Sequence, residues 1–156
     1  MPARMTIKDN GYKKLMEDTV KKLTPAYVKV GVFGEKGSAS RGNITNADIG
    51  ANAELGIGQP QRPWLSGYVD ETESEKRRQL GIIAKRALEG KSEILKDLDV
   101  FGAVIVGEIQ ERISAGIPPE NSERTKARKG SSTPLIDTGQ FRSSITHEVV
   151  KGRPSG

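Results

Sequence analysis

The chain has 156 residues, of which 34% are hydrophobic and 29% charged, and it carries a formal net charge of +5. This length suits one domain with its own core, and the absence of cysteine excludes disulfide bonds, thiolate metal ligands and a cysteine nucleophile. The N-terminus has no signal-like apolar region and no run reaches the ~20 apolar residues of a membrane span, so we expect a protein made in the cytoplasm without membrane contact.

The first two predicted elements are a helix and a strand. Apolar side chains recur three and four residues apart across residues 8–23, which predicts an amphipathic helix ended by Thr24-Pro25: Tyr12, Leu15, Met16, Thr19, Val20 and Leu23. Residues 26–33 are rich in β-branched and aromatic side chains between Pro25 and Gly34, so they predict a strand.

A loop, a short helix and a stiff connection are expected next. Residues 35–46 are polar, contain two glycines and lack apolar periodicity, so we expect a loop that is mobile in isolation and ordered by a partner. Residues 46–55 predict a helix that Gly56 ends. Trp64 follows a proline-rich connection at 58–63, and its preferred interpretation is a core residue, with an exposed interface anchor as the alternative.

Two long helices are predicted in the middle of the chain. The first spans residues 70–88 with Leu80, Ile83, Ala84 and Ala87 inward and its charged residues, Lys76 among them, in solvent. The second spans residues 92–115, with an inward stripe of Leu95, Leu98, Phe101, Ile105, Ile109 and Ile113 that is widened by Val100, Val104 and Val106. Such a helix should be buried on most of its circumference, either in the core or at a subunit contact.

The last third of the chain combines a basic arm, a helix and a strand. Residues 117–134 predict an extended arm with a run of positive charge at Arg124, Lys126, Arg128 and Lys129. Asp137 or Thr138 is expected to cap a helix ending at Ser144, and residues 145–150 a strand that pairs with 26–33. Residues 151–156 are expected to fray. Together these elements predict a single α+β domain over 1–156, with a small antiparallel sheet packed on long helices and an extended loop and arm.

The sequence offers little catalytic chemistry. Asp137-Thr138-Gly139 matches the triplet of aspartic proteases, which leaves a homodimeric protease as the least favoured alternative, whereas a cap is the preferred role of Asp137. His147 is the single histidine, so a histidine metal cluster cannot form within one chain. We therefore expect no enzyme activity, no metal and no cofactor.

Two motifs carry a resemblance to a known family. At Pro60-Gln61-Arg62-Pro63-Trp64-Leu65, and again from Lys129 through Leu135-Ile136-Asp137-Thr138-Gly139-Gln140-Phe141 to Ile145, the chain resembles tailed-bacteriophage neck proteins of the tail-completion, minor tail or virion-morphogenesis type. The order of predicted elements is similar over most of the chain. The family often has Leu or Arg after Gly-Gln or Gly-Arg, so Phe141 departs from the pattern while keeping an apolar anchor.

The resemblance implies a structural virion protein that assembles as a ring, commonly six-fold, at the head–tail junction or the top of the tail. Its implied partners are further copies of itself and the neighbouring head-closure, connector, tail-tube or tail-terminator proteins, with possible contact to packaged DNA. The alternative is a nucleic-acid-binding module that uses the basic run at 124–129. The candidate interface residues are Arg41, Arg62, Trp64, Arg124, Lys126, Arg128, Lys129, Leu135, Ile136, Asp137, Phe141 and Arg142.

Overall fold

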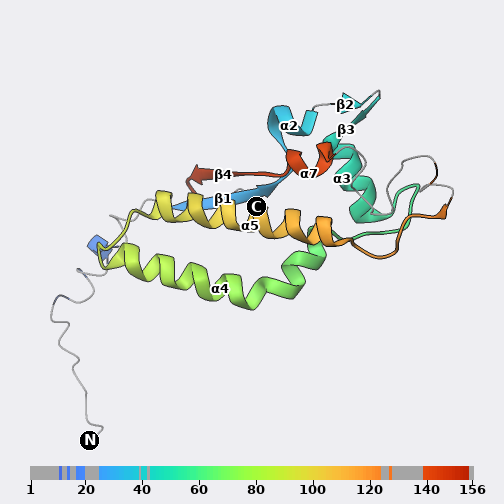
Figure 1. Ribbon diagram of the computed structural model, residues 1–156. Coiled ribbons are helices and arrows are strands. Elements are labelled where there is room, and N and C mark those ends of the chain that lie inside the picture. The colour runs from blue at the N-terminus through green and yellow to red at the C-terminus, as the bar shows by residue number, and fades with distance from the viewer. Residues whose placement is uncertain are drawn as a thin grey trace, which may run out of the picture.

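A computed structural model describes residues 11, 14, 17–19, 25–38, 40–41, 43–123, 127 and 139–154. Its elements are β1 (Ala26–Gly31), α2 (Gly34–Ser38), β2 (Ser40–Arg41), β3 (Ile44–Thr45), α3 (Asn46–Leu55), α4 (Ser66–Leu88), α5 (Ile94–Ala115), α7 (Gln140–Ser144) and β4 (Thr146–Lys151). They form the predicted α+β fold (Figure 1). Most of the predicted helix at 8–23 lies outside the described residues. Within that range, Lys14 and residues 17–19 are described as helical.

The main sheet is the predicted antiparallel pair. β1 and β4 pair from Ala26 opposite Lys151 to Gly31 opposite Thr146. The first strand ends two residues before its predicted end, because Gly34 adopts a left-handed φ of 63° and α2 begins there. The expectation of a frayed tail was wrong for its first residues, since Lys151 belongs to β4 and the Gly152 amide donates to the Pro25 carbonyl at 2.6 Å.

Helix α5 lies between this sheet and α4 (Figure 1). The predicted inward stripe is confirmed, with Leu98, Phe101, Ile109 and Ile113 buried. Within this chain α5 is not buried on most of its circumference, because Val100 and Val104 are 65% and 46% exposed, and its burial at a subunit contact stays a prediction. The sheet and α4 cover separate faces of α5 and leave these valines between them uncovered.

Helix α4 differs from its prediction in start and in orientation. It begins at Ser66, four residues before the predicted start, because the Glu54 carboxylate accepts hydrogen bonds from the Leu65 and Ser66 amides at 3.0 and 3.1 Å. A carboxylate from another helix thus caps it. Lys76, expected in solvent, is buried, whereas Leu80 is 39% exposed and Ala84 is also exposed.

The expectation of an irregular loop at 35–46 was wrong. This segment contains α2 and a small hairpin, in which β2 and β3 pair through Ser40 with Thr45 and Arg41 with Ile44. The Asn46 side-chain amide donates to the Lys36 carbonyl at 2.8 Å, and Thr45 and Asp48 form a reciprocal capping box that starts α3. These side-chain contacts hold polar residues in place where no apolar period exists.

The main cluster of buried core residues joins α3, α7 and the C-terminal half of α5. Gly56 ends α3 with a left-handed φ of 71°, as predicted. Helix α7 begins at Gln140 with Gly139 at its cap position, so the expectation of an Asp137 or Thr138 cap was wrong. The buried residues of this core are Ala53, Trp64, Tyr68, Ile109, Ile113, Ile117, Phe141 and Ile145.

Candidate interaction surfaces

Trp64 and Phe141, two of the candidate interface residues, lie inside the chain's own core. Trp64 is 5% exposed and Phe141 is 4% exposed, with their ring centroids 5.2 Å apart and the rings nearly perpendicular. The Trp64 indole donates from Nε1 to the Gly50 carbonyl at 2.9 Å. The interpretation of Trp64 as a core residue is confirmed, and both side chains join α3 to α7 instead of facing a partner.

The Arg62 side chain also makes its contacts within this chain and does not form a partner surface, because the residue is only 4% exposed. Its guanidinium donates to the main-chain carbonyl of Pro119 at 2.8 Å and to those of Glu120 and Pro60 at longer range. Burial lowers the pKa of Arg62. Ile117 is buried as well, so the first residues of the predicted arm belong to the body. The expectation of an extended arm was wrong for Glu123 and Ala127, which are helical and exposed, and residues 124–126 and 128–134 lie outside the described residues.

Among the other candidate residues, Arg142 contacts a neighbouring helix, and most of the rest lie outside the described residues. Arg142 donates to the Ser114 hydroxyl at 2.7 Å and its carbonyl accepts from Gln110, so it joins α7 to α5. Arg41 lies in β2, for which the backbone alone is described. The remaining candidates lie outside the described residues: Arg124, Lys126, Arg128, Lys129, Leu135, Ile136 and Asp137.

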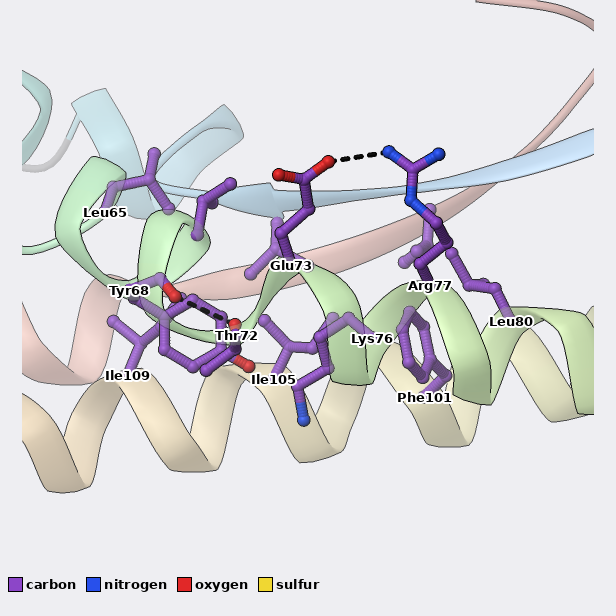
Figure 2. A pocket seen from close by; sticks show the side chains of 13 residues that line it. Leu65, Tyr68, Thr72, Glu73, Lys76, Arg77, Leu80, Phe101, Ile105 and Ile109 are labelled. Carbon is purple, nitrogen blue, oxygen red and sulfur yellow. Dashed lines mark hydrogen bonds and ion pairs between the residues drawn. The ribbon is translucent and has the colours of Figure 1, made fainter.

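A groove lies between α4 and β1 with α5 as its floor, here called the α4–β1 groove (Figure 2). Its volume is about 610 Å³. The lining residues are Val28, Val30, Leu65, Tyr68, Val69, Thr72, Glu73, Lys76, Arg77, Leu80, Phe101, Ile105 and Ile109. The surface that they present is largely apolar.

The polar side chains of this groove already have partners within the chain. Lys76 Nζ lies 2.8 and 2.6 Å from the two carboxylate oxygens of Glu108, to which the Tyr68 hydroxyl also donates. Thr72 donates to the Tyr68 carbonyl, and Arg77 pairs with Glu73 at 2.6 Å. A polar ligand would have to compete with these contacts, whereas an apolar one would not.

The pKa values of Tyr68 and Glu108 are shifted by their surroundings. Burial raises the pKa of Tyr68, and the adjacent Glu108 carboxylate raises it further, so the phenol stays protonated. Burial raises the pKa of Glu108 too, but hydrogen bonds from Lys76 and Tyr68 and the charge of Lys76 outweigh it, and the pKa lies below its ordinary value. Glu108 is therefore an ionised acceptor that fixes α4 on α5.

A second recess, the α4–α5 groove, lies nearer the C-terminal end of α4. It has a volume of about 370 Å³ and is lined by Gln79, Ile82, Ile83, Arg86, Asp97, Val100, Phe101 and Val104. Phe101 borders both grooves. Ile82 and Val100 are 50% and 65% exposed, so aliphatic side chains that the sequence places on amphipathic helices stay in contact with water.

A third apolar area lies at the opposite end of the molecule. Leu55, the last residue of α3, is 66% exposed, and Ile57 just beyond it is 57% exposed. Helix α3 and the connection between α4 and α5 mark the two ends of the body (Figure 1). The chain therefore carries exposed aliphatic surface on two well separated and different parts of its fold.

The sequence contained part of the signal for these surfaces. Extending the helical period of α4 back from residue 70 would have placed Leu65, Tyr68 and Thr72 on one face with Lys76. The ion pair between Lys76 and Glu108 joins positions 32 residues apart, so no local pattern could have assigned it.

Among the described residues no group of His, Cys, Asp and Glu side chains could hold a metal ion, and no helix there is long and apolar enough to cross a membrane. No protein-family model, no curated protein and no solved structure matches the chain. The chemistry of the described surfaces therefore carries the functional argument.

Proposed function

We propose that the protein is a structural component of a phage virion, at the head–tail junction or the top of the tail, where it completes or terminates the tail as a ring of identical subunits. The resemblance at residues 60–65 and 129–145 supports the virion role. Assembly as a ring is supported by two exposed apolar areas that differ from each other, one around Val100 and one around Leu55.

A ring requires this kind of asymmetry. Subunits in a ring meet head to tail, so each one must present two different surfaces that complement each other. The α4–α5 groove offers Ile82, Val100 and Val104 as one surface, and the end of α3 offers Leu55 and Ile57 as the other. Burying such side chains at a contact contributes roughly 25 cal/mol for each Å² of apolar surface removed from water.

In this proposal the basic arm, residues 117–134, contacts the proteins that adjoin the ring. Arg62 holds the carbonyls of Pro119 and Glu120, which fixes the chain four residues before the positive run at 124–129 begins. An acidic surface on an adjoining ring would complement that run, and we favour protein over DNA because no aromatic side chains are interleaved for base stacking.

Native mass spectrometry of the purified chain and of two variants tests this proposal. The wild-type chain should form one closed oligomer, and Val100→Glu should shift it to monomer because a carboxylate would be buried at the contact. Ser74→Glu is the matched control, since it adds the same charge at an exposed position of α4 outside both grooves. A wild-type chain that stays monomeric at all concentrations, or a Val100→Glu variant that assembles like Ser74→Glu, would contradict the ring.

A further inference from the structure

The α4–α5 groove contains two charged side chains that have no partner among the described residues. Arg86 and Asp97 line this groove beside Ile82, Val100 and Val104. Arg86 is exposed, and no described residue forms an ion pair with it. Neither oxygen of the Asp97 carboxylate accepts a hydrogen bond from a described residue, and Oδ2 is shielded from water. A partly desolvated carboxylate without a donor is costly, so this groove favours an occupant that brings both a hydrogen-bond donor and an acceptor.

The C-terminal end of α3 offers the acceptor. The last four carbonyls of a helix lack partners within it, and here those of residues 52–54 accept hydrogen bonds from groups just beyond the helix. The Leu55 carbonyl accepts none from a described residue. The last turn of α3 contains no basic side chain, so the partial negative charge of this helix end is not offset within the chain.

The donor lies four residues beyond Leu55. Gln59 is half-buried, and its side-chain amide makes no hydrogen bond within the described part of the chain. Ile57, which is 57% exposed, stands between these two residues. The segment therefore presents an acceptor, an aliphatic side chain and a donor, whereas the α4–α5 groove presents a donor, aliphatic side chains and an acceptor.

We propose that two polar contacts set the register between neighbouring subunits. Arg86 binds the Leu55 carbonyl at the end of the neighbouring copy's α3, and Asp97 accepts a hydrogen bond from the neighbouring copy's Gln59. This assignment rests on the proposed ring. Apolar surfaces alone tolerate sliding, whereas hydrogen-bonded charges fix one alignment and reject other apolar surfaces. A cation at the C-terminal end of a helix also gains from the helix dipole.

Exchanging amide and carboxylate tests the pairing of Asp97 with Gln59. Gln59→Glu should raise the concentration at which half of the chains are assembled by about tenfold or more, because it brings a second carboxylate to Asp97. Adding Asp97→Asn should return that concentration to within about threefold of the wild type, since the new amide donates to the new carboxylate. Sedimentation velocity over a dilution series measures the assembly of each variant.

Asp70→Asn is the matched control for this rescue. It removes the same charge at an exposed position of α4 outside both grooves, so combining it with Gln59→Glu should restore nothing. Because the rescue depends on position and not on net charge, it separates a direct contact from a general effect of charge on assembly.

Arg86→Gln tests the contact with the end of α3. It should raise the half-assembly concentration by about tenfold, because the helix end loses its cation. Lys85→Gln removes the same charge from the adjacent residue, which lines neither groove, and should leave assembly unchanged. Both side chains are exposed in the single chain, so neither replacement disturbs the core.

The possible failures of the ring and of its register are distinguishable. A wild-type chain that never assembles would overturn the ring and this contact with it. If the ring forms but Gln59→Glu leaves it intact, or Asp70→Asn rescues as well as Asp97→Asn, the pairing of positions 97 and 59 is wrong while the ring stands. An Arg86→Gln variant that assembles like Lys85→Gln would overturn the contact with α3.

Discussion

At the scale of single residues, a few charged side chains with distant partners hold the elements in place. Glu54 of α3 caps the start of α4, Arg62 holds the carbonyl of Pro119, and Glu108 of α5 binds Tyr68 and Lys76 of α4. Each of these contacts joins segments at least 11 residues apart. Buried polar groups of this kind are costly when one partner is removed, so they define which elements meet.

Replacing Glu108 should reduce stability in a pH-dependent way. Its pKa is lowered in the folded state, so its contribution is complete above the unfolded value of about 4.3 and is lost as the pH falls through the folded value. Urea unfolding followed by Trp64 fluorescence should show a wild-type advantage over Glu108→Gln that is larger at about pH 7 than at about pH 4. Glu111→Gln, on an exposed part of the same helix, should show no such dependence. An advantage that grows on acidification would contradict the assigned role.

At the scale of elements, α5 organises the fold by packing the sheet on one face and α4 on another. Its approach to the sheet depends on Gly102, where an added Cβ would lie 2.6 Å from His147 Cδ2 and 2.8 Å from Val28 Cγ2. His147 Nε2 also lies 2.9 Å from Asp99 Oδ1. A small residue on α5 and a strand side chain thus set the distance between the two layers.

Two glycines of α5 should respond in opposite ways to replacement by alanine. Gly102→Ala should destabilise the protein by about 1–3 kcal/mol, because the methyl group overlaps His147 and Val28. Gly107→Ala in the same helix meets no atom within 4 Å and should stabilise it by about 0.5–1 kcal/mol through helix propensity. Urea denaturation of both variants would measure this, and equal effects would contradict the close packing at Gly102.

Elements with a strong local pattern could be predicted from the sequence. The valine-rich strand at β1, the Gly56 end of α3 and the inward stripe of α5 follow from β-branched content, left-handed glycine and helical period. The hairpin at β2–β3, the early start of α4 and the burial of Lys76 were missed, because Asn46, Glu54 and Glu108 determine them through distant contacts. Of the candidate interface residues, Arg62, Trp64 and Phe141 are buried within this chain, and only for Trp64 was a core position the preferred interpretation.

At the scale of the whole molecule, two of the places where aliphatic side chains are exposed lie far apart. Val100 and Val104 lie in the middle of α5 beside α4, and Leu55 and Ile57 lie at the end of α3. Single exposed apolar residues are common on protein surfaces, but clusters of them mark interaction sites. In our proposal these two clusters meet between neighbouring subunits, and the arm at residues 117–134 contacts an adjoining ring.

Mixing two damaged subunits tests this head-to-tail contact most directly. Val100→Glu and Leu55→Glu each damage one side of the contact, so each variant alone should stay monomeric. An equimolar mixture retains one intact pair of surfaces, and native mass spectrometry should show a heterodimer and no closed ring. A mixture that stays monomeric, or either variant alone closing into the wild-type oligomer, would contradict the account.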